Sequence, residues 1–118
     1  MIPADSKEEL IQGLLVTKQR ANILEVRLLL RGETGEEAKK VAEKSKALTR
    51  QIDKLLGQVM DEWQGQAAKI IKDIKTANAA LQRSITNIRK KVQTAQNIVK
   101  AIGLIDEVIT IAKGLTSI

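Results

Sequence analysis

Apolar residues recur at helical spacing from the first ten residues onward. Steps of three, four and seven separate the apolar positions of the first segment, which are Leu10, Leu14, Ala21, Leu24 and Leu28. Residues at these steps share one face of an α-helix, so the spacing predicts an amphipathic helix. Ser6 with Glu9 fits a capping box at its start, and Arg31 before Gly32 is typical of a helix end. The pattern therefore predicts a first helix over about 6–31.

A second helix start follows a turn at 32–34. Thr34 with Glu37 fits another capping box, and two boxes around a glycine-bearing turn predict an antiparallel helical hairpin. From there the apolar positions continue with no proline or clean cap. After Val41 they are Leu48, Ile52, Leu55, Val59, Trp63, Ala67, Ile70, Ile74, Ala77, Leu81, Ile85, Ile88, Val92, Ala95, Val99 and Ile102. These steps of three and four predict one long, coiled-coil-like helix over about 35–101.

Two glycines mark the one weak region of this long helix. Gly57 and Gly65 should each destabilise a helix interior by about 1 kcal/mol relative to alanine. The alternative interpretation places a break near 57–65 and gives a three-helix bundle. Beyond Gly103 the apolar residues spread over more than half of the helix circumference and predict an apolar C-terminal helix over about 103–116. Each interpretation is all-α, with residues 1–118 as a single domain.

The composition excludes most catalytic chemistry. The chain has 118 residues and contains no His, Cys, Tyr or Phe. It therefore has no imidazole base, no thiolate nucleophile, no disulfide and no zinc cluster of the usual kind. Neither a Glu-x-x-His metal motif nor a phosphate-binding loop is present. We expect no enzymatic activity, no catalytic residue, no metal, no cofactor and no small-molecule substrate.

The sequence contains no targeting signal that we can identify. Its first residues show no basic region followed by an apolar run, and no uncharged apolar stretch reaches the roughly 18 residues of a membrane span. We expect a cytoplasmic protein. Peripheral attachment to a membrane is the alternative.

Positive charge is concentrated in one segment. The net charge is +6, and residues 69–100 carry eight Lys or Arg and one Asp, whereas residues 1–68 carry eleven of each sign. The candidate docking residues are Lys69, Lys72, Lys75, Arg83, Arg89, Lys90 and Lys91, which we call the basic strip. Such a strip would attract an acidic protein surface or an anionic membrane. No nucleic-acid-binding motif accompanies it, so specific nucleic-acid binding is not expected. The simpler alternative is a solvated face that only aids solubility.

The predicted hairpin leaves an apolar stripe uncovered. The first helix can reach only to about residue 62 of the long helix, and a soluble chain does not leave such a stripe exposed. We therefore expect another copy or another helical chain to cover it. The candidate interface residues are Trp63, Ile70, Ile74, Leu81, Ile88, Val92, Val99, Ile105 and Ile109.

The sequence thus predicts a non-enzymatic helical interaction or assembly protein: a scaffold, adaptor or structural subunit. It would oligomerise or bind a partner through apolar helix faces, and the basic strip would dock electrostatically. The alternative is a membrane-associating or pore-forming helical protein that uses the apolar C-terminal segment, residues 98–118.

Overall fold

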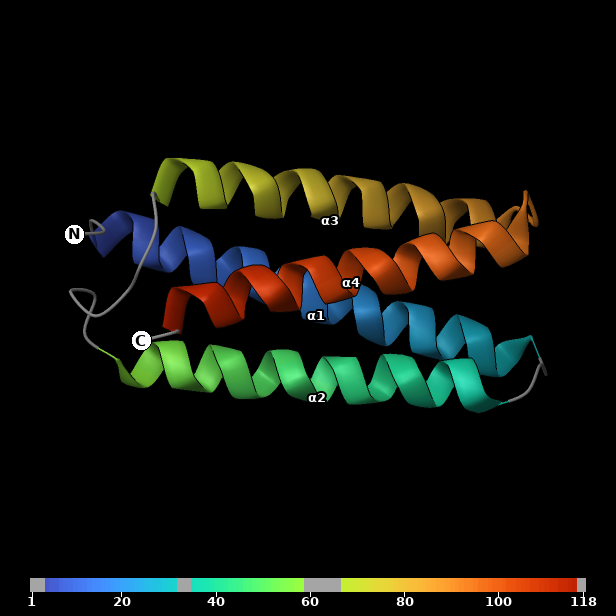
Figure 1. Ribbon diagram of the computed structural model, residues 1–118. Coiled ribbons are helices and arrows are strands. Elements are labelled where there is room, and N and C mark those ends of the chain that lie inside the picture. The colour runs from blue at the N-terminus through green and yellow to red at the C-terminus, as the bar shows by residue number, and fades with distance from the viewer. Residues whose placement is uncertain (1–3, 32–34, 59–66, 117–118) are drawn as a thin grey trace.

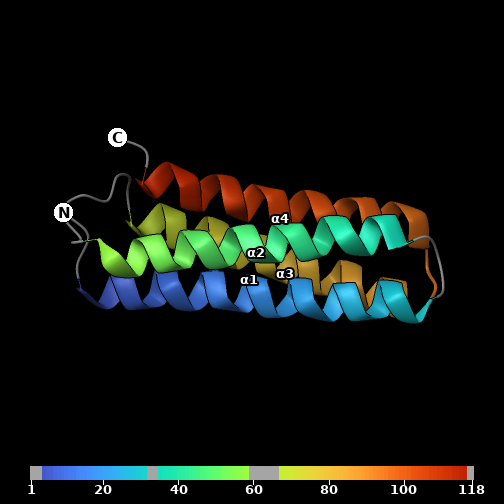
Figure 2. The ribbon, with the colours of Figure 1, turned by 90° about the horizontal axis from the view of Figure 1, so that it is seen from below.

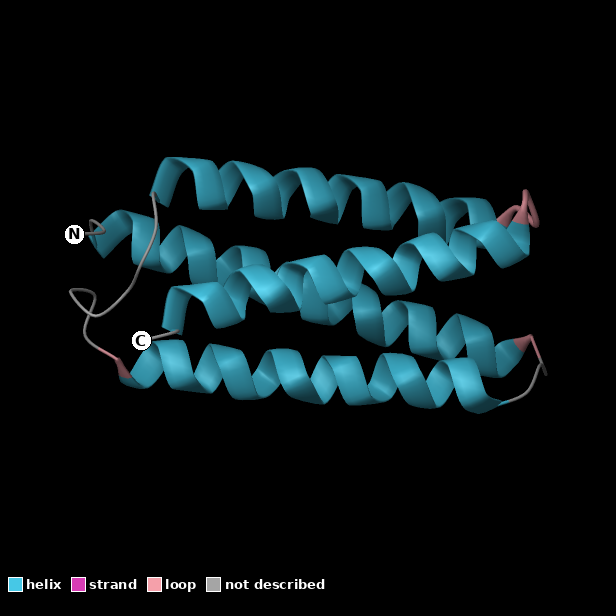
Figure 3. Ribbon diagram, in the orientation of Figure 1, coloured by secondary structure: helices cyan, strands magenta, loops and turns pink. Residues whose placement is uncertain are grey.

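The structure is a computed structural model that describes residues 4–31, 35–58 and 67–116. All regular structure in these ranges is helical (Figure 3). The helices are α1 (Ala4–Leu30), α2 (Gly35–Gly57), α3 (Ala67–Arg89) and α4 (Thr94–Thr116). The predicted all-α class is confirmed.

The four described helices pack side by side into an elongated bundle of 45 × 21 × 18 Å. α1 lies beside α2 and α3, and α4 lies beside the same two helices (Figure 1). Figure 2 shows α1 and α4 on opposite sides with α2 and α3 between them. α1 and α3 run in one direction, while α2 and α4 run in the other (Figure 1). Each of α1 and α4 therefore has one parallel and one antiparallel neighbour.

All four helices contribute aliphatic side chains to one core. Leu14 and Leu24 of α1, Leu48 of α2, Leu81 of α3 and Ile105 of α4 have no exposed surface. Each amphipathic helix buries its apolar face against the others, and this removal of apolar surface from water is the main driving force for the fold. The predicted apolar spacing thus marks the inward faces of α1, α2 and α3, whereas Ala95 and Val99 of α4 lie on its exposed side.

The continuous helix predicted over 35–101 is wrong. α2 ends at Gly57, and a second interruption at residues 90–93 separates α3 from α4. The alternative break near 57–65 agrees with the end of α2, but the described residues form four helices instead of three. Folding back at both points lets the chain cover its own apolar stripe. Val59, Trp63 and Gly65 lie outside the described residues.

The turn between α3 and α4 has the hydrogen bonds of a Schellman motif. Lys91 N donates to Ile88 O at 3.0 Å, and Val92 N donates to Asn87 O at 2.9 Å. Lys91 adopts the left-handed conformation of this motif, with φ 61°. Glycine usually occupies that position, and its absence explains why the sequence did not indicate a helix end here.

The start of α1 also differs from the prediction. The helix begins at Ala4, so Ser6 lies in its first turn and is not the N-cap residue of the predicted capping box. The end at Leu30 lies one residue before the predicted Arg31. Thr34, the first residue of the second predicted capping box, lies outside the described residues.

Candidate functional site

Most of the predicted apolar interface lies inside this chain. Ile74, Leu81, Ile88, Ile105 and Ile109 are buried, and Ile70 packs against the core. The expectation of an oligomer depended on an exposed apolar stripe. Within the described residues most of that stripe is covered, because the chain folds back over it. Val92 and Val99 are exposed by 48% and 71%. Trp63 lies outside the described residues.

The C-terminal segment belongs to the same core. The apolar residues of α4 that are buried are Ile98, Ala101, Ile105, Val108, Ile109, Ala112 and Leu115. The wide apolar sector packs against both α2 and α3, which explains why it covers more of the helix than a single neighbour needs. Lys44 of α2 also forms an ion pair with Asp106 of α4.

All seven residues of the basic strip are exposed. Four of them lie along α3: Lys69, Lys72, Lys75 and Arg83. Arg89 is the last residue of that helix, and the turn after it contains Lys90 and Lys91. Lys75 Nζ lies 2.7 Å from Glu9 Oε1 of α1, so this side chain is engaged in an ion pair. The strip thus divides into side chains along α3 and a cluster at the end of the bundle.

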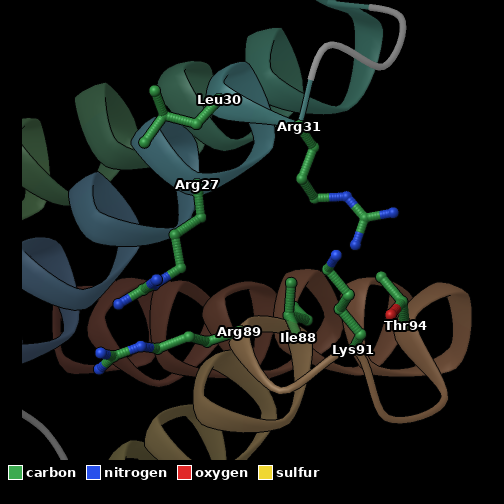
Figure 4. A pocket seen from close by; sticks show the side chains of 7 residues that line it. All are labelled: Arg27, Leu30, Arg31, Ile88, Arg89, Lys91 and Thr94. Carbon is green, nitrogen blue, oxygen red and sulfur yellow. The ribbon is translucent and has the colours of Figure 1, made fainter.

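The end cluster borders a pocket between α1 and α3. The pocket has a volume of about 640 Å³ and is lined by Arg27, Leu30, Arg31, Ile88, Arg89, Lys91 and Thr94. Four of these residues are cationic and none is acidic, and we call this the cationic pocket. In Figure 4, Arg27 and Arg89 lie side by side, while Arg31 and Lys91 extend toward each other. The fold thus brings side chains of like charge together.

Helix electrostatics account for some of these cations. α1 and α3 are parallel, so their C-terminal ends lie at the same end of the bundle (Figure 1). A helix C-terminus carries a partial negative charge that nearby Lys or Arg stabilises. Arg27 and Arg89 each lie in the last turn of their helix. Yet within the described part of the chain, neither Arg27, Arg89 nor Lys91 forms an ion pair.

Sequence reasoning missed Arg27 as a site residue and used Arg31 only as a helix-end signal. Both arginines lie in residues 1–68, where positive and negative charges are equal in number, so this region showed no excess of positive charge. Their spacing of four residues places them on one side of a helix, and this spacing was the only sequence feature that could have indicated a shared site. The pairing of α1 with α3 was needed to place them beside Arg89 and Lys91.

The outward side of α1 carries an exposed aliphatic surface, which we call the α1 outer face. It consists of Leu15, Ile23, Val26, Leu29 and Leu30, whose exposures range from 40% to 80%. At about 100° per residue, these side chains fall within a sector of roughly 120°. Arg20, Arg27 and Arg31 lie on the adjoining side of α1, where they meet α3 or line the cationic pocket. Gln19 and Asn22 are exposed in the same sector, so the apolar part of the α1 outer face is concentrated over residues 23–30 and has a basic edge.

A polar cluster fixes α1 against α3. The Thr17 hydroxyl donates to Asn78 Oδ1 at 2.5 Å, and Asn78 Nδ2 donates to Gly13 O at 3.0 Å. Arg20 Nη1 donates to Asn78 O at 2.7 Å. Thr17 and Asn78 are buried, so leaving their polar groups unpaired would be unfavourable. The cluster therefore favours one register of the two helices, and this register sets the geometry of the cationic pocket.

Other classes of site find no support in the described residues. Within 4–31, 35–58 and 67–116, no group of three or more His, Cys, Asp or Glu residues is placed to hold a metal ion. None of the described helices combines the length and apolar character required to cross a membrane. Comparison with protein-family models, curated proteins and solved structures finds no match to this chain.

Proposed function

We propose that this protein is a non-enzymatic helical interaction protein that docks an acidic partner protein on the α1 outer face. The observation that carries the proposal is the concentration of exposed aliphatic side chains on one side of α1. Ile23, Val26, Leu29 and Leu30 fall within two turns of helix and all are at least 45% exposed. Single exposed aliphatic residues are ordinary, whereas a contiguous apolar surface is typical of an interaction site.

The chemistry of the expected partner follows from the surroundings of this face. Arg27 and Arg31 lie beside it, and five of the seven residues of the basic strip lie on the neighbouring α3. Complementary charge accelerates association and disfavours partners of the same sign. An amphipathic helix with apolar residues at spacings of three and four and with acidic flanks would match both properties.

In this proposal the α1 outer face binds the partner, whereas the sequence had predicted partner binding by the apolar stripe of the helix over 35–101. α3 and α4 direct most of that stripe into the core, so it does not support docking of a partner. The same burial leaves the C-terminal membrane alternative without a specific observation in its favour. The basic strip keeps its proposed electrostatic role, because its side chains remain exposed.

Site-specific photo-crosslinking in the native cells tests this proposal. A photoreactive amino acid at Val26 should capture a partner peptide that is rich in Asp and Glu. The same amino acid at Val99 is the matched control, since Val99 is an exposed valine on α4, across the bundle from α1. The proposal predicts capture from position 26 that is absent from position 99. The substitutions Ile23→Gln and Leu30→Gln should abolish that capture, because they remove the apolar contacts on either side.

Three outcomes would contradict the proposal. Capture of a second copy of this chain from position 26 would make the face a self-association surface. Equal capture from positions 26 and 99 would indicate non-specific contact. The absence of any crosslink from position 26 would show that the α1 outer face is not an interface.

A further inference from the structure

The cationic pocket contains more positive charge than its helix ends require. Three of the cations that line it, Arg27, Arg89 and Lys91, form no ion pair among the described residues, and a helix terminus carries only about half of an elementary charge. α4 also begins at the cationic pocket, with Thr94, and a helix N-terminus carries a partial positive charge. The positive potential in the pocket therefore exceeds what the C-termini of α1 and α3 offset.

The arrangement of the side chains also favours an external anion. Arg27 comes from α1, whereas Arg89 and Lys91 come from the end of α3 and its turn, and they line one space. Among the described residues these three cations have no carboxylate partner, and the buried Nε atom of Arg27 has no hydrogen-bond acceptor. Like charges held together in this way repel each other, and a bound anion would relieve that repulsion.

We propose that the cationic pocket binds a small anion that carries two or more phosphate groups. The planar guanidinium groups of arginine match phosphate oxygens with paired hydrogen bonds, and lysine adds a compact positive charge. The volume of about 640 Å³ lies within the range of about 300–1,000 Å³ typical of small-molecule sites. Such a pocket offers room for more than one phosphate group. Leu30 and Ile88 supply an apolar wall for the remainder of the ligand.

The anion site can be tested separately from the proposed protein docking. The docking surface is the outward side of α1, whereas the anion would lie between α1 and α3. Leu30 borders both sites, but Arg89 and Lys91 do not belong to the α1 outer face. Anion binding needs no partner protein, so the two proposals can fail separately.

Isothermal titration calorimetry with tripolyphosphate tests the anion site on the full chain. The test variant is Arg89→Gln with Lys91→Gln. The control variant is Lys72→Gln with Arg83→Gln, which removes the same charge from exposed positions along α3, outside the residues that line the pocket. Position 91 has a left-handed backbone conformation, and glutamine is about as strained there as lysine. The substitution should therefore leave the turn unchanged. Circular dichroism spectra that match the unchanged protein establish that both variants fold.

The proposal predicts one tripolyphosphate per chain. The pocket variant should bind on the order of a hundredfold more weakly, because it loses two charge-assisted contacts. The control variant should stay within about threefold, since solvent and salt screen distant surface charges. Citrate, a polyanion with carboxylate instead of phosphate groups, should bind more weakly than tripolyphosphate.

A second arm separates a free anion from a lipid headgroup. Vesicles of phosphatidylcholine with a phosphatidylinositol bisphosphate, whose headgroup carries more than one phosphate group, are offered to the same three proteins. Binding of tripolyphosphate with no pocket-dependent vesicle binding identifies a soluble ligand, and vesicle binding that only the pocket variant loses identifies a lipid phosphate. Equal losses in the pocket and control variants would overturn the proposal. So would citrate binding as tight as tripolyphosphate, or no binding of either phosphate source.

Discussion

Lys91, in the turn after α3, has a backbone conformation that lysine rarely adopts. Its φ of 61° lies in the left-handed region, which is unfavourable by roughly 1–2 kcal/mol for a residue with a side chain. The hydrogen bonds from Lys91 N and Val92 N to the last turn of α3 offset part of this strain. Asn97 contributes as well, since its Nδ2 donates to Val92 O at 2.7 Å. The turn is thus held by contacts and not by the preference of its own residue.

Glycine at this position should stabilise the protein. We expect Lys91→Gly to raise the free energy of unfolding by about 1 kcal/mol, because glycine adopts the left-handed region without steric strain. Urea denaturation measures the change. Lys91→Gln is the control, because it removes the same charge and keeps the strain, so the difference between the two variants reports the backbone alone. A Lys91→Gly protein no more stable than Lys91→Gln would contradict this account of the turn.

Asparagine residues that look like surface residues in the sequence have internal roles. Asn78 and Asn97 occur among the polar neighbours of the basic strip, yet both are buried and hydrogen-bonded. Asn78 joins α3 to α1, and Asn97 holds the turn before α4. Sequence spacing could not assign these roles, because an amide side chain is equally compatible with solvent and with a buried partner.

At the scale of the helices, α1 and α3 are closely packed at Gly13. A Cβ atom added at Gly13 would lie 2.8 Å from Ile74 Cγ2, which is closer than a normal van der Waals contact. Ile74 is buried and branched at Cβ, so its side chain has little freedom to move away. The absence of a side chain at Gly13 therefore permits the parallel pairing that places Asn78 against the backbone of α1.

Alanine substitutions at two helical glycines should have opposite effects. We expect Gly13→Ala to lower the free energy of unfolding by roughly 1–3 kcal/mol, because overpacking outweighs the better helix propensity of alanine. Gly103→Ala in α4 should raise it by about 1 kcal/mol, since nothing lies within 4 Å of the added Cβ. Thermal or urea unfolding of the two variants measures both values. A gain in stability from both substitutions would show that α1 and α3 are not closely packed at Gly13.

At the scale of the whole molecule, two reversals of the chain replace the expected partner. A helix over 35–101 would have left apolar residues such as Leu81 and Ile88 for another molecule. The bundle instead covers these two α3 residues with α1 and α4, and both are buried. What remains exposed is a smaller apolar surface on α1, together with isolated residues such as Val99.

Two residues from the predicted interface should therefore behave differently. Ile105→Ala should lower the free energy of unfolding by about 2–5 kcal/mol, because Ile105 is fully buried and its loss leaves a cavity. Val99→Ala should change it by less than about 0.5 kcal/mol, because Val99 is exposed. Chemical denaturation of both variants, with light scattering to record the oligomeric state, makes the comparison. Similar losses at both positions would indicate that Val99 is covered by another molecule.

The sequence by itself determined the helical class, the approximate extent of α1, the start of α2 and the faces of α1, α2 and α3 that become apolar core. At the start of α4 the predicted stripe was wrong, because Ala95 and Val99 are exposed. These features depend on residue spacing and on local capping signals, which act within a few turns. The basic strip was also evident, since it is a regional excess of charge. Its side chains are exposed, as expected for charged residues that lie off the apolar face.

Only the tertiary structure decided where the chain reverses and which helices become neighbours. The reversal at Lys91 uses a residue without helix-ending preference, and its hydrogen bonds become apparent only in the folded turn. The cationic pocket combines Arg27 and Arg31 with Arg89 and Lys91, which are about sixty residues away in the sequence. Periodicity identifies the apolar side of a helix, but long-range packing selects the helix that covers it. The pocket and the α1 outer face follow from that selection.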